Sequence, residues 1–234
     1  MLQKTFPLTG DSLNQAVWPT PKDYIMNIKR TSWIAILLLT CNSAGADWSA
    51  NIGWVSDYYF RGIHQKSSSA QGGVDFEHGG FFAGVWGADV GERTGDGLEI
   101  DGYFGYGGEV GRFNYSAGYT GYFYTGDFDD RYQELNLSAG YGFATVDVAL
   151  GQYDNFDGPT VDYSYYAFTL AHEGFYARYG SFDRDLGGAH YEVGYATSVS
   201  DIDIGLSALY SDENLAGEAT EALVFTIGKT FDIN

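Results

Sequence analysis

The sequence predicts an all-β protein, a transmembrane up-and-down antiparallel β-barrel of about 12 strands within a range of about 10–14. Residues 48–61 alternate between an apolar or aromatic face and a polar face, as a strand does. The alternation outlasts an ordinary strand of about 5–6 residues and suits a membrane-spanning one of about 9–11. A glycine closely followed by phenylalanine recurs at positions 80, 111, 142 and 174, which indicates repeated hairpins.

Composition agrees with long strands. Glycine is common at 33 residues, proline is rare at 4, and aromatic residues make up 18% of the chain. Proline removes a donor from the strand ladder, so its scarcity favours a β protein. The mean hydropathy of −0.21 is compatible with a membrane barrel, because half of each strand faces a polar lumen.

The first 46 residues are predicted to direct secretion of the chain and not to form part of its fold. Residues 26–46 are predicted to be a secretory signal peptide, with a basic start, a short apolar run and the small-residue cleavage site Ala44-Gly45-Ala46. Residues 1–25 are predicted to be a leader, with Met26 as an alternative start site, and residues 47–234 are predicted to form the barrel.

The predicted mature chain is strongly acidic. The whole chain carries a net charge of −19, and removing residues 1–46, with four bases and two acids, gives about −21. This argues against nucleic acid as a partner and against binding to an anionic surface through a basic patch.

Turn signals divide the mature chain into predicted strands joined alternately by tight turns and longer polar loops. An even strand number places both termini at the short-turn, periplasmic end. Residues 63–68 are predicted as the first long loop. The predicted strands are residues 48–61, 69–78, 81–90, 97–109, 112–124, 132–141, 143–153, 162–172, 175–183, 188–199, 201–210 and 220–233.

Charged residues in these strands fall almost entirely on one parity, which is predicted to face inward. A lipid-facing charge at mid-depth costs about 2–4 kcal/mol in such barrels, so the pattern has an energetic cause. Lys229 is the exception: either it snorkels toward the interface, or the strand register slips there. The predicted lumen-lining residues are Asp57, Arg61, Asp75, Glu77, Glu99, Asp101, Glu134, Asp147, Arg178, Glu192 and Asp203.

This lumen has two interpretations. A ring of carboxylates would favour cations in an open pore. Alternatively, the charges pair inside a plugged lumen, which the large inward residues Tyr59, Tyr103, Tyr122 and Tyr124 could close.

Aromatic residues crowd the strand ends and are predicted to form two interfacial girdles, with generic β propensity as the alternative. The girdle candidates are Trp48, Tyr58, Phe60, Tyr122, Phe123, Tyr124, Tyr132, Tyr141, Tyr153, Tyr165, Tyr166, Phe175, Phe182 and Phe231.

The sequence gives little indication of a catalytic or metal-binding site. His64 lies beside Ser67, but the sequence indicates no third group to orient the histidine, so no catalytic residue is predicted. No cofactor or metal is predicted either, since acidic loop clusters are more often solvated than Ca²⁺ sites.

The opening strand carries a family resemblance. The pattern Asn51-x-Gly53-x-x-Ser56-Asp57-Tyr58-x-Phe60-Arg61-Gly62-x-x-Gln65, followed by Gln71-Gly72-Gly73-x-Asp75, resembles the start of the TorF-type family of proteobacterial porins. The resemblance implies an outer-membrane barrel and no catalytic residues. The C-terminal segment 226–234 resembles the signal that barrel-assembly machinery recognises.

The sequence therefore predicts a porin-like channel of the bacterial outer membrane for small cationic or neutral hydrophilic solutes. The alternatives are a non-conducting structural or adhesive barrel and, third, a lipid-modifying hydrolase. Expected partners are outer-membrane lipid, lipopolysaccharide, the barrel-assembly machinery and the solutes.

Overall fold

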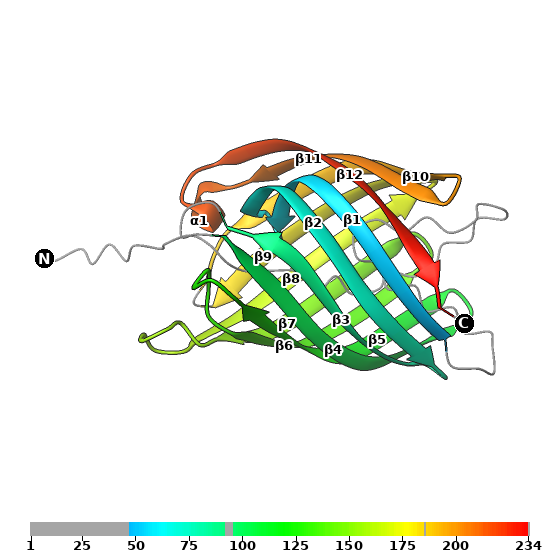
Figure 1. Ribbon diagram of the computed structural model, residues 1–234, viewed down its shortest axis with the longest axis horizontal. Helices are drawn as coiled ribbons and strands as arrows, with labels where there is room; N and C mark the ends of the chain where they lie inside the picture. Colours follow the sequence, from blue (N-terminus) through cyan, green and yellow to red (C-terminus); the bar gives the residue numbers. More distant parts are fainter. Residues whose placement is uncertain (1–46, 92–95, 185, 234) are drawn as a thin grey trace, which may run out of the picture.

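The chain folds into one closed barrel. The computed structural model describes residues 47–91, 96–184 and 186–233, so the predicted leader and signal peptide lie outside the described residues. Each strand pairs antiparallel with its sequence neighbours, and β12 pairs with β1 to close the sheet (Figure 1). This confirms the predicted fold class, a transmembrane up-and-down barrel of twelve strands.

The strand bounds agree with the prediction to within a residue or two at nearly every end. They are β1 (Asp47–Phe60), β2 (Ile63–His78), β3 (Phe81–Val90), β4 (Gly97–Val110), β5 (Phe113–Tyr124), β6 (Tyr132–Tyr141), β7 (Ala144–Tyr153), β8 (Val161–His172), β9 (Phe175–Arg184), β10 (Ala189–Val199), β11 (Ile202–Ser211) and β12 (Thr220–Asp232).

Two-residue turns close one end of the barrel, here named the short-turn end. The β2–β3 and β8–β9 turns have positive φ at both central residues, Gly79-Gly80 and Glu173-Gly174. That geometry matches the right-handed twist of the flanking strands. The C-terminus lies at this end, and α1 lies at the opposite, long-loop end (Figure 1).

The first connection differs from the prediction. Residues 63–68 are part of β2, and β1 joins β2 through the two-residue turn Arg61-Gly62, with φ of 44° and 88°. The polar composition of 63–68 predicted a loop, but a turn with positive φ at both positions lets these residues pair directly with the end of β1. A register shift between Tyr58 and Tyr59 accompanies this pairing.

A short helix, α1 (Glu213–Ala216), occupies the predicted loop between β11 and β12. The Asp212 side chain accepts hydrogen bonds from the backbone of Asn214 and Leu215, and Gly217 ends the helix with φ of 80°. No helix in the described part of the chain is both long and apolar enough to cross a membrane.

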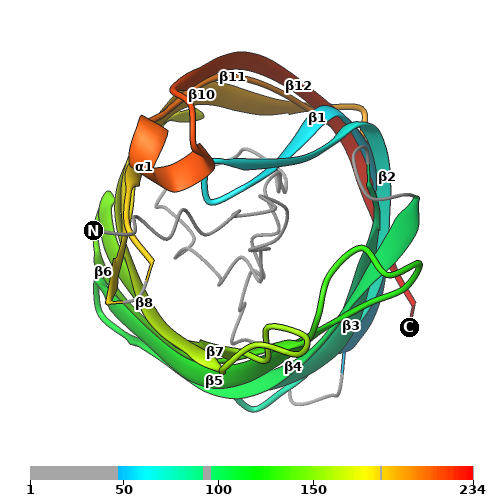
Figure 2. The same ribbon diagram turned by 90° about the vertical axis from the view of Figure 1, so that its left-hand side faces the viewer.

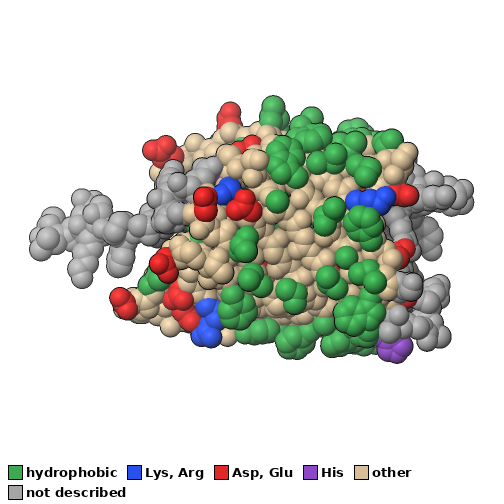
Figure 3. All heavy atoms as spheres, viewed as in Figure 1, with side chains coloured by type: hydrophobic (Ala, Val, Ile, Leu, Met, Phe, Trp, Pro, Cys, Tyr) green, Lys and Arg blue, Asp and Glu red, His purple; other side chains and the backbone are tan. Residues whose placement is uncertain are grey.

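The outer wall of the barrel is apolar. On the face in Figure 3, hydrophobic side chains project from the wall at many points and are densest toward the short-turn end, whereas most acidic side chains lie toward the long-loop end. Lys229 is the exception that was expected, and its ammonium lies 5.6 Å from the centre of the Phe231 ring near the end of β12. Large exposed hydrophobic residues on the strands include Ile52, Val74, Val85, Leu98, Ile100, Phe104, Leu135, Leu137, Val146, Phe168, Leu206, Leu223 and Ile227.

The girdle prediction holds for part of the aromatic set only. Trp48, Phe123, Tyr141, Tyr166, Phe175 and Phe231 are exposed on the outer surface. The prediction is wrong for six other residues, which are buried: Tyr58, Phe60, Tyr122, Tyr132, Tyr165 and Phe182. Tyr58 packs in one cluster inside the barrel and the other five pack in a second, and both clusters belong to the candidate site described next.

Candidate functional site

The tip of the β1–β2 hairpin bends into the barrel. The register between β1 and β12 ends at Val55 and Thr226, and beyond it the side-chain hydroxyl of Ser56 accepts a hydrogen bond from Phe225 N at 3.0 Å. Tyr58 then reaches β4, where its hydroxyl donates to Glu99 at 3.2 Å. Figure 2 looks into the long-loop end and shows the hairpin turning inward from the wall.

Arg61, in the turn, contacts the far wall. Its two terminal nitrogens lie 2.6 and 2.9 Å from the two carboxylate oxygens of Glu134 on β6. Because β6 stands about half-way around the barrel from β1, this ion pair crosses the lumen. Both side chains are buried, with exposed fractions of 7% and 0%.

Glu134 has further donors. The hydroxyl groups of Tyr122 and Tyr163 each donate to one of its oxygens at 2.8 Å. A buried carboxylate is stable only when paired and hydrogen-bonded, and here both oxygens have two donors each. The Glu134 carboxylate therefore has its counter-ion and its hydrogen-bond donors within the cluster and needs no contact with solvent.

Aromatic rings surround the guanidinium of Arg61. Its central carbon lies 4.7 Å from the Phe60 ring centre, 4.2 Å from that of Tyr165 and 5.9 Å from that of Phe182. Such cation–π contacts contribute about 2 kcal/mol or more when desolvated. We name the residues around this ion pair the tip cluster: Phe60, Arg61, Tyr122, Glu134, Tyr163, Tyr165 and Phe182.

Backbone contacts hold the turn itself. Ser211 on β11 donates its hydroxyl hydrogen to the Gly62 carbonyl at 2.5 Å. A Cβ on Gly62 would lie 2.6 Å from the Cβ of His190 and 2.8 Å from a Leu215 methyl carbon, so only glycine fits at this position. The turn is thus packed against β10, β11 and α1.

A second apolar group fills the adjacent part of the lumen. Tyr58 and Val55 pack with Ala88 and Val90 of β3 and with Phe128 from the loop after β5. Tyr58 also meets Trp86 edge to face at 5.9 Å between ring centres. Together with the tip cluster, these side chains lie in the lumen toward the long-loop end.

Acidic residues lie on the strands between the tip cluster and the short-turn end. Asp75 accepts hydrogen bonds from Tyr103 and from Asn51, the latter at 3.3 Å, and Glu192 accepts one from Tyr176. Asp147 accepts from Ser138 at 2.7 Å. Arg178 donates to Thr169 at 2.9 Å and lies 4.0 Å from Asp147.

The structure separates the other predicted lumen residues. Glu99 and Asp101 are buried on β4, and Asp203 is buried on β11, while Glu77 is half-buried near the end of β2. Asp57 lies apart from the tip cluster, where it accepts a hydrogen bond from Ser67 at 2.8 Å. Arg61 and Glu134 are thus a predicted pair that the structure joins across the lumen.

Asp57, His64 and Ser67 lie close together but do not form a catalytic triad. His64 Nε2 lies 3.4 Å from the Ser67 hydroxyl oxygen and 3.6 Å from Asp57 Oδ1. In a triad the acid and the serine bind opposite ring nitrogens, whereas both approach Nε2 here. The serine also donates to the carboxylate rather than to the histidine.

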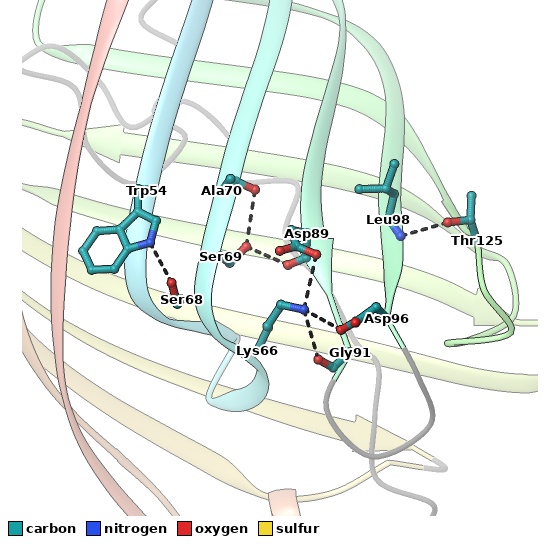
Figure 4. Close-up of polar contacts among 10 residues, drawn as sticks. All are labelled: Trp54, Lys66, Ser68, Ser69, Ala70, Asp89, Gly91, Asp96, Leu98 and Thr125. Atoms are coloured by element: carbon teal, nitrogen blue, oxygen red, sulfur yellow. Dashed lines mark hydrogen bonds and ion pairs between the residues drawn. The ribbon is translucent and has the colours of Figure 1, made fainter.

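Lys66 joins the two sides of the β3–β4 loop (Figure 4). Its ammonium lies 3.3 Å from Asp89, 3.4 Å from the Gly91 carbonyl and 2.8 Å from Asp96. The hydrogen bond from Lys66 lowers the pKa of the exposed Asp96 carboxyl. Lys66 therefore connects the end of β3 with the residue before β4.

Replacing Lys66 with methionine is expected to weaken the contacts that hold Gly91 and Asp96, because the methionine keeps the apolar stem but loses the ammonium. The Gly91 amide, which donates to the Gln65 carbonyl, should then exchange its hydrogen faster than in the wild type. Lys229→Met, on the outer wall, is the control and should leave that rate unchanged. Equal exchange in Lys66→Met and wild type would contradict this role of Lys66.

Asp129, in the loop between β5 and β6, is a buried acid. Tyr132 and Tyr153 donate to its two oxygens at 2.7 and 2.8 Å, and their rings stack 4.2 Å apart. Burial raises the pKa of Asp129 to about 8, although these hydrogen bonds oppose the rise. The folded loop thus binds a proton more tightly than the unfolded chain does.

This raised pKa predicts a pH dependence of stability. Because the folded pKa exceeds the unfolded value of about 3.9, the contribution of Asp129 is full below about pH 4 and is lost as the pH rises to about 8. The urea midpoint should fall over that window in the wild type and fall less in Asp129→Asn. Asp157→Asn, which changes an exposed loop acid, should keep the wild-type slope. An unchanged slope in Asp129→Asn would refute the assignment.

Sequence reasoning missed most of the tip cluster. Tyr122 was expected to face inward, but Tyr163, Tyr165 and Phe182 were not assigned to the lumen. Tyr163, Tyr165 and Ala167 share one parity on β8, opposite the exposed Tyr166 and Phe168, and that parity was the available signal. Among the described residues, no group of His, Cys, Asp or Glu has the geometry of a metal site.

Fold and site together define a membrane-spanning β-barrel with a side-chain cluster across its lumen. Residues 40–210 match the family model described as a bacterial protein of unknown function (Gcw_chp), and the chain belongs to this family. No curated protein sequence matches the chain. The TorF-type resemblance stays a prediction.

Solved structures resemble the chain at low sequence identity. A chain from the study titled "Unveiling the Mechanism Behind the in-meso Crystallization of Membrane Proteins" is 8% identical over 80% of this chain and 84% of its own, with a TM-score of 0.51. An outer-membrane channel from Pseudomonas putida F1 is 10% identical over 80% and 96%, with a TM-score of 0.47. A BenF-like porin from Pseudomonas fluorescens Pf-5 is 10% identical over 77% and 58%, with a TM-score of 0.40.

Proposed function

We propose that this protein is a porin-like channel of the bacterial outer membrane that passes small cationic or neutral hydrophilic solutes. The observation that carries the proposal is a closed barrel with an apolar outer wall and carboxylates on its inner face. Asp75, Asp147, Glu192 and Asp203 stand on four different strands, so acid is distributed around the lumen. Carboxylates placed this way attract cations and repel anions.

The cationic residues support the same selectivity. Arg61 is neutralised by the bidentate contact with Glu134, and Arg178 lies between Asp147 and the hydroxyl of Thr169. The lumen therefore keeps an excess of negative charge. The tip cluster, with its ion pair across the lumen, would limit the solutes to small ones.

The location and partners follow from the same proposal. The predicted signal peptide at 26–46 would direct the chain out of the cytoplasm, and the apolar wall would contact outer-membrane lipid and lipopolysaccharide. β12 closes the barrel against β1, which suits a C-terminal strand recognised by barrel-assembly machinery. The TorF-type resemblance supports this assignment to a porin class.

A second candidate function is a non-conducting surface barrel. The ion pair between Arg61 and Glu134 favours it, because a fully satisfied buried cluster across the lumen stabilises a closed state. The hydrolase alternative has less support, since His64 and Ser67 lack triad geometry. We propose no enzymatic activity.

The reversal potential of protein in a planar bilayer with a salt gradient tests the channel. Cation selectivity is expected in the wild type, and it should weaken when Asp147 and Glu192 become Asn and Gln, because two lumen charges are removed. Asp157→Asn, outside the barrel wall, is the matched control. Folded protein that never conducts, under any variant or voltage, would support the non-conducting barrel.

A further inference from the structure

The inward bend of β1 leaves part of the barrel wall without its usual neighbour. From Thr226 to Asp232, β12 pairs with β1 on one side and, in part, with β11 on the other. Its residues from Thr220 to Phe225 pair with β11, and the β1 register stops before them. Across this gap Phe225 N donates a hydrogen bond to the Ser56 side chain and not to the β1 backbone.

A straight β1 would fill this gap in the existing register. Continuing the pairs Trp54–Ile227 and Val55–Thr226 one residue at a time places Tyr58 opposite Leu223 and Phe60 opposite Glu221. Backbone groups of β12 that lack a strand partner would then gain one. Such pairing is strongly favoured at membrane depth, where water does not satisfy backbone groups.

Side-chain chemistry also fits the straight strand. Leu223 has an exposed fraction of 71%, on the same outer face as Phe225 and Ile227. Tyr58 opposite Leu223 would face lipid, continuing the outward set Ile52 and Trp54. The alternation of residues 48–61 is thus obeyed throughout only if β1 runs straight, whereas the observed structure breaks it between Val55 and Tyr58, both of which pack in the lumen.

We infer that residues 56–61 exchange between two positions, the observed one in the lumen and a second one alongside β12. The inward position gains the Arg61–Glu134 ion pair, the ring contacts and the Gly62–Ser211 hydrogen bond. The outward position gains a strand ladder with β12 and lipid-facing aromatic residues. Ser56 marks the hinge, because the register with β12 ends just before it.

This exchange would regulate passage through the barrel, and that consequence rests on the proposed channel function. In the inward position Phe60 and Arg61 lie across the lumen. In the outward position they leave it, and Glu134 is exposed to solvent with the other lumen acids. The same movement therefore opens the lumen and completes the wall.

Disulfide trapping tests the exchange. Tyr58→Cys with Leu223→Cys should cross-link under a mild oxidant only if β1 reaches β12, because Tyr58 is buried against Glu99 and Trp86 in the observed position. Trp54→Cys with Ile227→Cys is the matched control, since these residues are directly opposite in the observed register. Positions 54 and 58 have the same pair type, because antiparallel pairs alternate with a period of two.

A second cysteine pair controls for the possibility that replacing Tyr58 itself displaces the tip. Tyr59→Cys with Ala222→Cys leaves Tyr58, Phe60 and Arg61 intact and is opposite in the continued register. Cross-linking of both test pairs supports the exchange. Cross-linking of the control pair alone, in folded protein, overturns it.

Conductance of the oxidised Tyr58→Cys/Leu223→Cys protein then tests the channel separately. Conductance that rises on oxidation and falls on reduction supports both the exchange and the channel. A cross-linked protein that stays silent supports the exchange and contradicts the proposed channel function.

Discussion

Replacing Arg61 with alanine is expected to raise the permeability of the barrel and lower its stability. The substitution leaves Glu134 buried with two tyrosine donors but no cation. Removing one partner of a buried ion pair costs about 3–5 kcal/mol when the site stays closed. Withdrawal of the tip relieves that cost by admitting water, so solute uptake into liposomes should become faster while the urea midpoint falls.

Two variants control this prediction. Arg61→Lys keeps the charge but does not reproduce the two parallel hydrogen bonds to Glu134, so it should give an intermediate effect. Arg131→Ala removes the more exposed ion pair with Asp154, at 2.7 Å, and should change neither measurement much. Uptake by Arg61→Ala equal to that of the wild type would show that the ion pair does not hold the tip.

Replacing Gly62 with alanine is also expected to have a large effect on solute uptake and on stability. The new Cβ would lie 2.6 Å from the Cβ of His190 and 2.7 Å from the Ser211 hydroxyl oxygen. Both neighbours belong to the wall, so the tip itself must move. Solute uptake into liposomes should rise, and the urea midpoint should fall.

Gly79→Ala is the matched control for that change. Gly79 also has positive φ in a two-residue turn, 59° against 88° for Gly62, but a Cβ there meets nothing within 4 Å. Both variants share the backbone strain of a non-glycine residue with positive φ, about 1–3 kcal/mol. Only Gly62→Ala adds crowding, so uptake that rises equally in both variants would contradict the packed tip.

The sequence predicted the barrel because alternation and turn chemistry are local. Glycine in two-residue turns and a period of two along each strand determine the strand bounds, and these agree closely from β3 onward. The inward parity of Glu99, Asp101 and Glu134 also follows from alternation, and the structure buries all three.

The tip cluster could not be predicted in the same way. Tyr58 and Phe60 have the parity of the lipid-facing residues Ile52 and Trp54, but the bend after Val55 turns them inward. That bend depends on contacts between residues far apart in the sequence, such as Arg61 with Glu134 and Gly62 with Ser211. Alternation along one strand carries no information about such contacts.

Arg61 shows most clearly how its role in the structure differs from the role expected from the sequence. As a strand residue it was expected to be one charge on a lumen wall. As a turn residue with φ of 44°, it projects across the lumen to the opposite strand. The change of role follows from the two-residue turn, which the polar stretch after Gly62 concealed.

Single-channel recording of the wild-type protein beside Arg61→Ala shows whether the β1–β2 tip obstructs the lumen. The wild type is expected to be mostly closed, with brief openings, and Arg61→Ala to have longer, cation-selective openings. Steady wild-type conductance at the level of Arg61→Ala would mean that the tip cluster does not limit passage.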